Sequence, residues 1–263
     1  MHFSEILAQI GADEHQTIHI PEGWGQGRAL FGGLVAGIAY HHGAHGVQSG
    51  QLLRAMTVSF VAPVAAGDVE LSRVVLRQGK NVTQTRVDMI QSEQVVLSAL
   101  LTFGAGRESI VNVNDLPKPN IPSYDGVPDF PKTPFTPEFT QHYNYAVTVG
   151  GMPFSGNTSH EFGGWVRYSQ EQSPINIALF LGLVDAWPPA VITHLTQPAP
   201  ASSLTWTIEF PEPLDPALKT SDWWQYLATI DYAADGYGHT HAHIWDHQGN
   251  LVAISRQTVT VFG

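Results

Sequence analysis

The 263-residue sequence contains no cysteine, which excludes disulfide scaffolds, thiolate zinc sites, iron–sulfur clusters and cysteine nucleophiles. Charged residues are also scarce, because Asp, Glu, Lys and Arg make up only 13% of the chain. Disordered and coiled-coil proteins carry far more charge, so this composition predicts a folded globular protein. No apolar run reaches the roughly 18–20 residues that span a bilayer, so we expect no association with a membrane.

Basic residues are the rarer charged kind, since 12 Lys and Arg stand against 23 Asp and Glu, for a formal net charge of −11. Nucleic-acid binding depends on cationic contacts to phosphates, so we expect no nucleic-acid partner. Residues 1–105 carry a net charge of −2 and residues 106–263 carry −9, which indicates that the two halves of the chain differ in composition. The first seven residues, MHFSEIL, lack the basic segment of a secretion signal. A cytoplasmic location is therefore expected.

Two segments are apolar nearly all round and long enough to form helices. They cover residues 31–40 (FGGLVAGIAY) and residues 175–187, where Pro188 and Pro189 end the second one. A helix without a polar face must be buried on most sides. A short amphipathic helix is also expected over residues 3–10.

Alternating apolar and polar residues predict strands with short connections, which therefore pair antiparallel. The expected strands cover residues 17–20, 53–61, 69–76, 83–90 and 95–103, and then 165–168, 203–210, 223–233, 238–245 and 251–262. Between the two sets, seven prolines lie from Pro117 to Pro137, which predicts an extended linker.

The order of strand, apolar helix and strand meander occurs twice, so we predict a duplicated α+β unit. Residues 52–60, followed by Pro63, parallel residues 202–210, followed by Pro213. A twisted sheet with one apolar face can wrap around one apolar helix, which explains the missing polar face. This predicts a tandem (double) hot-dog with antiparallel sheets each wrapping a buried helix. Its N-terminal hot-dog covers residues 1–105, the proline-rich linker 106–150, and the C-terminal hot-dog 151–263.

Four motifs, in order, resemble the acyl-CoA thioesterase II family. They are FGGLVAG at 31–37, VSFVAP at 58–63, RQGKNV at 77–82 and DHQGNLVAISRQ at 246–257. The resemblance covers residues 20–105 and 160–263. It implies an enzyme that hydrolyses a fatty or related acyl-CoA to the free acid and CoA, with no metal or other cofactor.

The same resemblance implies the residues of the site. In that family an aspartate, a serine or threonine and a glutamine hold the water that attacks the thioester, and these match Asp185, Ser203 and Gln257. Ser202 takes the hydroxyl role if the register slips by one residue. The family often has Asp-His just after the hydroxyl residue, where this chain has Thr205-Trp206, and a further His where it has Pro211. These departures bear on substrate preference.

Asp185 also stands out from the residues alone, because it follows the apolar run 178–184. An unpaired carboxylate in such a helix costs several kcal/mol of desolvation, so it is a candidate site residue. The alternative is that Asp185 meets water where the prolines end the helix. Gly32 and Gly33, at a helix start, let backbone N–H groups approach a thioester oxygen as substrate-binding residues. Their alternative role is close packing against the sheet.

Other chemistries are less favoured. His239, His241 and His243 alternate on one strand, but side chains at i and i+4 lie about 13 Å apart, too far for one metal ion. We expect them on an outer or subunit-facing surface, and any homo-oligomer would use such a face. No G-x-S-x-G nucleophile elbow and no P-loop motif occur. The remaining alternative is a catalytically inert protein that binds acyl or other hydrophobic ligands on the same fold.

Overall fold

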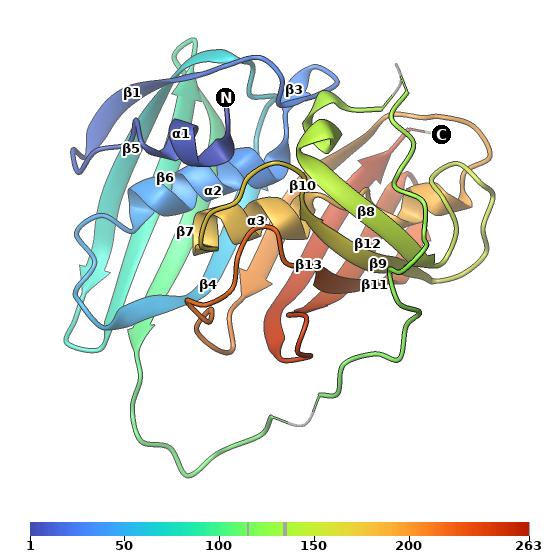
Figure 1. Cartoon of the computed structure of the whole chain (residues 1–263). Coiled ribbons are helices and arrows are strands. Elements are labelled where there is room, and N and C mark those ends of the chain that lie inside the picture. The colour runs from blue at the N-terminus through green and yellow to red at the C-terminus, as the bar shows by residue number, and fades with distance from the viewer. Residues whose placement is uncertain (115, 134–135, 263) are drawn as a thin grey trace.

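One large antiparallel sheet dominates the computed structural model, which describes residues 1–114, 116–133 and 136–262 (Figure 1). The first part of the chain contributes β1 (His15–Ile20), β4 (Gln51–Phe60), β5 (Gly67–Gln78), β6 (Val82–Gln91) and β7 (Gln94–Ala105). The second part contributes β8 (Tyr143–Val149), β9 (Glu161–Tyr168), β10 (Ala201–Glu209), β11 (Trp224–Ala234), β12 (Tyr237–Trp245) and β13 (Leu251–Val261). A separate ribbon joins β2 (Gly25–Gln26) and β3 (Ala29–Leu30).

The sheet has a repeated order on either side of its centre. Its 11 strands run β1-β5-β6-β7-β4-β10-β13-β12-β11-β9-β8 in the described part of the chain, and β4 and β10 pair at the middle. Both central strands carry a bulge at the same place, between Leu53 and Ala55 in β4 and between Ser203 and Thr205 in β10. The two irregularities lie 150 positions apart, so the halves repeat each other down to the local register.

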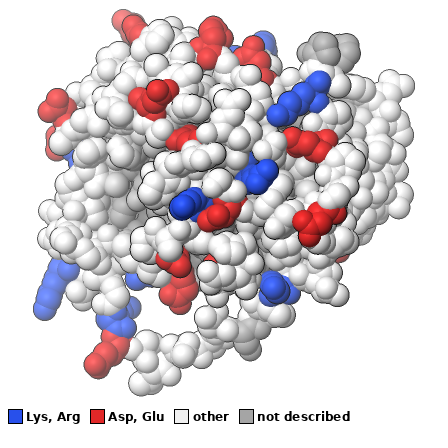
Figure 2. All heavy atoms as spheres, in the orientation of Figure 1, with Lys and Arg blue, Asp and Glu red and all other residues white. Residues whose placement is uncertain are grey.

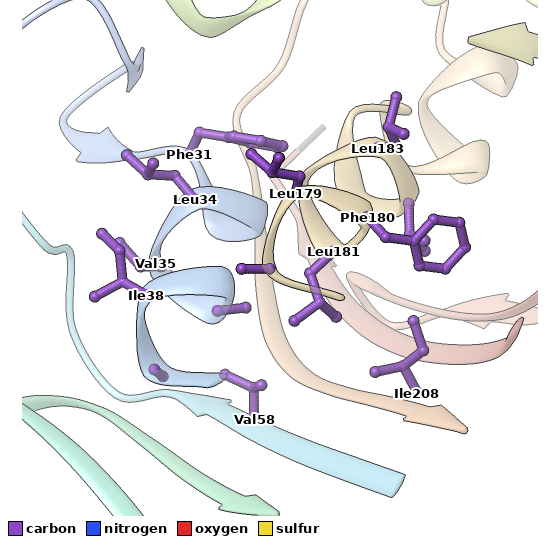
Figure 3. Packing of buried hydrophobic residues seen from close by; sticks show 14 of the residues in the cluster. Phe31, Leu34, Val35, Ile38, Val58, Leu179, Phe180, Leu181, Leu183 and Ile208 are labelled. Carbon is purple, nitrogen blue, oxygen red and sulfur yellow. The ribbon is translucent and has the colours of Figure 1, made fainter. Parts of the chain in front are cut away.

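The helices lie on one face of this sheet. They are α1 (Phe3–Leu7), α2 (Gly32–Gly43) and α3 (Ile177–Asp185), together with two 3-10 turns, η1 (Glu138–His142) and η2 (Ala190–His194). Figure 1 shows α2 and α3 side by side, and α2 also packs on β5, β6 and β7. Apolar side chains of both helices meet Val58 of β4 and Ile208 of β10 in the core (Figure 3).

The two central helices run antiparallel and approach closely. A Cβ at Gly37 of α2 would come within 2.6 Å of the Ala178 carbonyl oxygen of α3, so only glycine permits this spacing. At the other end, Gly32 lies beside Asp185. The start of α2 therefore meets the end of α3.

The expected elements and the observed ones differ mainly between residues 106 and 150. The sequence predicts a linker over this whole range, yet η1 and β8 occupy its last part, and β8 pairs with β9 at the sheet edge. The alternation in YNYAVTV at 143–149 is a strand signal that the neighbouring prolines obscure. The helix expected over 3–10 ends at Leu7, and its next residues turn.

One stretch among the described residues, 177–194, is apolar enough and long enough to cross a membrane by composition, with a mean hydropathy of 1.4. It consists of α3, a proline turn and η2, and 72% of it is buried inside the fold. Its apolar side chains therefore belong to the core. On the face shown in Figure 2, charged side chains are scattered among uncharged ones without a continuous basic patch.

Candidate active site

Three side chains from separate elements meet where α3 ends against the sheet. The Gln257 Nε2 on β13 donates hydrogen bonds to Asp185 Oδ1 and to Ser203 Oγ, each at 3.1 Å. Asp185 is the last residue of α3, and Ser203 lies on β10 beside its bulge. The three residues that the sequence predicts for the site thus form one hydrogen-bonded group, although 72 positions separate Asp185 from Gln257.

Asp185 has an unusual proton affinity for a carboxylate. Burial raises its pKa from the usual 3.8 to about 7, while hydrogen bonds from Gln257 and from the Gly33 backbone N–H oppose that rise. The side chain still keeps part of its surface exposed. A carboxylate with a pKa near neutrality is suited to accept a proton from water and to release it again.

Gly32 and Gly33 adjoin this carboxylate at the first turn of α2. A Cβ at Gly32 would come within 2.7 Å of Asp185 Oδ2, and one at Gly33 within 3.0 Å of the Asp185 Cβ. The absence of side chains therefore allows the N-terminus of α2 to reach the carboxylate. The Gly33 N–H donates to Asp185. Close packing of the pair is therefore observed, while backbone donation to a thioester oxygen stays a prediction.

The register of β10 distinguishes the two candidate serines. Ser203 is partly buried and hydrogen bonds Gln257, whereas Ser202 is exposed and its backbone carbonyl accepts from Thr260 Oγ1. The two residues that stand where the family often has Asp-His, Thr205 and Trp206, differ in burial. Thr205 is exposed, while Trp206 is buried and its Nε1 donates to Ser255 Oγ at 2.8 Å. Trp206 therefore belongs to the core.

An aromatic cluster surrounds Asp185 that the sequence reasoning did not single out. The ring of Trp187 stacks on Tyr226 with centroids 5.1 Å apart, and Tyr145 donates from its hydroxyl to the Ala186 carbonyl. Burial, followed by the charge of Asp185, raises the pKa of Tyr226. The only sequence signal was the position of Trp187 two residues after Asp185. Trp187 and Tyr145 are themselves buried, so the end of α3 packs among aromatic rings.

The described residues contain no group of three or more His, Asp or Glu side chains placed to hold a metal ion. His241 of the three-histidine strand pairs instead with Asp231 at 2.8 Å, and Arg256 contacts the same carboxylate at 3.1 Å. His239, His241 and His243 alternate with buried residues along β12. They therefore lie on the sheet face opposite the helices.

Solved structures with the same fold cover the whole chain. A hot-dog protein of unknown function from Alicyclobacillus acidocaldarius has a TM-score of 0.88 at 24% identity, covering 100% of this chain and 99% of its own. An acyl-CoA thioesterase II from Mycobacterium marinum has a TM-score of 0.76 at 17% identity, covering 99% and 98%. No curated protein sequence matches the chain. These likenesses define the class as a hot-dog protein.

Family models assign the chain more closely. The acyl-CoA thioesterase N-terminal domain matches residues 20–104, and the acyl-CoA thioesterase C-terminal domain matches residues 119–261. Together they cover most of the sequence. The chain belongs to the acyl-CoA thioesterase family.

Proposed function

We propose that this protein is an acyl-CoA thioesterase that hydrolyses a fatty or related acyl-CoA to a free acid and CoA. The observation that carries the proposal is the bridge from Gln257 to both Asp185 and Ser203 beside the N-terminus of α2. Family membership supports the reaction class. We also interpret the repeated strand order around two central helices as a double hot-dog.

In the proposed reaction, Asp185 acts as the general base. Its carboxylate takes a proton from a water molecule while that water attacks the thioester carbonyl carbon. Ser203 Oγ and Gln257 orient the same water, since a hydroxyl and an amide can each hold a hydrogen bond to it. The tetrahedral intermediate then expels the CoA thiolate, the proton on Asp185 returns to a product, and the free acid leaves. No covalent intermediate is required, because a thiolate is a good leaving group.

The start of α2 supplies the electrostatic part of the proposal. Backbone N–H groups in the first turn of a helix lack partners within the helix and point along its positive dipole end. Because the Gly33 N–H bonds Asp185, the Gly32 N–H is our candidate donor to the oxyanion. The missing Cβ at Gly32 leaves the room for that approach.

A matched pair of serine variants tests the proposal. Thiol release from short, medium and long acyl-CoA is measured for the wild type, Ser203→Ala and Ser202→Ala. Ser203→Ala is expected to lower kcat/KM by about tenfold or more through loss of one oriented hydrogen bond. Ser202→Ala should match the wild type, because its side chain faces solvent. Equal effects of the two substitutions would refute the assigned register.

The alternative is an inert protein that binds acyl or other hydrophobic ligands on this fold. The departures at Thr205, Trp206 and Pro211 are what favour it. An absence of thiol release at every chain length, combined with measurable acyl-CoA binding, would support that alternative. A cytoplasmic location and a homo-oligomer built through an outer face remain part of the proposal.

A further inference from the structure

A cavity lies at the place that the internal repeat relates to the candidate active site. It has a volume of about 450 Å³, within the range of about 300–1,000 Å³ of small-molecule sites. Its wall includes the end of α2, the starts of α3 and β4, the end of β7 and the segment that follows β10. The candidate active site is built from the equivalent elements of the other half, with the end of α3, the start of α2 and the strands β10 and β13.

The repeat identifies the counterpart of each site residue. Asp185 lies nine positions after the N-cap of α3, Asn176, and Tyr40 lies nine positions after the N-cap of α2, Phe31. The equivalent bulges of β4 and β10 make Leu53 the counterpart of Ser203.

The remaining counterparts follow from the strand register. Phe103 faces Leu53, and Val259 faces Ser203, in their respective strand pairs. Two positions earlier on each strand, Leu101 therefore takes the place of Gln257. Tyr40, Leu53 and Phe103 all line the cavity.

This cavity differs from the candidate active site in the side chains that the repeat places there. Leu53 stands in place of the hydroxyl residue and Leu101 in place of the amide residue, so the hydrogen-bonded group of Asp185, Ser203 and Gln257 has no equivalent there. Leu53, Phe103, Ile177 and Phe210 supply apolar surface of the kind that packs an aliphatic chain. The cavity therefore offers apolar surface to an aliphatic chain but lacks the counterpart of the candidate catalytic group.

Two hydrogen-bond donors line the same cavity. The Tyr40 hydroxyl has no hydrogen-bond partner within the described ranges, and the Arg54 guanidinium forms no ion pair there, although Glu212 also lines the cavity. Arg54 uses its Nε to donate to the Gly104 carbonyl at 3.2 Å. Its remaining N–H groups can bind an anion, and a guanidinium is well matched to a carboxylate.

A third polar group in the wall is incompletely bonded. Gln51 is buried, and its Oε1 has no hydrogen-bond partner within the described residues, while its Nε2 donates to the carbonyls of Gly79 and Lys80. Buried polar atoms in proteins are nearly always paired. An acceptor of this kind can be satisfied by a water molecule, and such a water could in turn donate to a bound carboxylate.

We propose that this cavity is a non-catalytic binding site for an aliphatic carboxylic acid, whose chain packs on the leucine and phenylalanine side chains and whose carboxylate binds Tyr40 and Arg54. Such an acid belongs to the class of the reaction product, and that identification rests on the proposed function. A bound acyl thioester is less favoured, because a thioester carbonyl carries no charge for Arg54 to bind.

The test is a calorimetric titration of the full chain with dodecanoate, carried out with and without a saturating non-hydrolysable acyl-CoA thioether. The thioether blocks the candidate active site, so one equivalent of dodecanoate should still bind. Tyr40→Phe and Arg54→Gln should each weaken that binding by about tenfold or more, since each removes a hydrogen bond to a charged group. Arg77→Gln is the charge-matched control, because Arg77 is exposed and lies outside the cavity. It should bind dodecanoate like the wild type.

Three outcomes would overturn the proposal. They are complete displacement of dodecanoate by one equivalent of thioether, binding of two thioethers per chain, and unchanged affinity in both cavity variants. Tyr40→Phe keeps the ring in its core position, so it stays informative if Arg54→Gln fails to fold. Thiol release is measured on the same samples. Its absence would refute the proposed function while leaving the dodecanoate titration readable.

Discussion

Replacing Gln257 by alanine should change the pH profile of thioester hydrolysis in two separable ways. Gln257 donates to Asp185 Oδ1 and to Ser203 Oγ, so its removal affects both the charge of the base and the orientation of the water. The wild-type kcat/KM should rise with pH and level off above about 7, because Asp185 must be ionised to accept a proton and its pKa is about 7.

The magnitude follows from the lost hydrogen bond. A hydrogen bond to a charged group contributes about 1.5 kcal/mol or more, and about 1.4 kcal/mol corresponds to one pKa unit. Because the Gln257 bond lowers the pKa of Asp185, its loss should move the midpoint of the profile upward by about one unit. Ionised Asp185 at pH 7 would then fall from about one half to about one tenth, a loss of about fivefold. That part disappears above about pH 9.

The orientation effect should persist at every pH. Loss of a positioned water lowers the alkaline plateau by a further factor on the order of 10 to 100. The assay is thiol release between pH 5 and 9.5, with spontaneous hydrolysis subtracted. The control is Gln84→Ala, since Gln84 is an exposed strand glutamine on β6. An unshifted midpoint would refute contact with the base, and an unchanged plateau would refute water positioning.

Three further predictions concern the same elements. Asp185→Asn should abolish most activity, yet it should stabilise the fold at alkaline pH. The pKa of Asp185 is about 7 in the folded protein and 3.8 ordinarily, so the neutral carboxyl favours the folded state at acid pH. That contribution to the free energy of unfolding is lost as the pH rises through 7, and an asparagine does not lose it. Denaturant midpoints should show the variant gaining on the order of 2 kcal/mol over the wild type between pH 5 and 9, and a pH-independent difference would contradict this. Gly32→Ala should lower kcat/KM by about tenfold or more, since its Cβ would sit 2.7 Å from Asp185 Oδ2, whereas Gly106→Ala, with nothing within 4 Å, should be neutral in the same assay. Asn176→Ala should cost about 1 kcal/mol in urea unfolding, because the Asn176 side chain accepts from the Leu179 N–H at the start of α3, and a loss near zero would show that the cap is dispensable.

Local sequence patterns predict much of this architecture. The apolar segments at 31–40 and 175–187 correspond to α2 and α3, because a helix without a polar face has no other stable place than the core. Alternation likewise located β4, β5, β6 and β7, since a half-buried strand exposes every second residue. The strand β8 was missed because proline density dominates its surroundings and its pairing partner, β9, follows only after residue 160.

The candidate site, too, was predictable only in part from the sequence. Asp185 was recognisable from its own neighbourhood, as an ionisable residue ending an apolar helix, whereas Ser203 and Gln257 were assigned through the family resemblance. Their bridging hydrogen bonds, and the pKa of about 7 for Asp185, depend on contacts between residues far apart in the chain.

The sequence by itself therefore determined the elements, their repetition and the absence of thiol chemistry, because periodicity and composition act locally. Only the tertiary structure showed that Asp185, Ser203 and Gln257 meet in one hydrogen-bonded group and that burial raises the pKa of Asp185. The antiparallel packing of α2 against α3 creates two related places, with Asp185 at one and Tyr40 at the other. Their chemistry differs because burial, register and partner residues are properties of the folded chain.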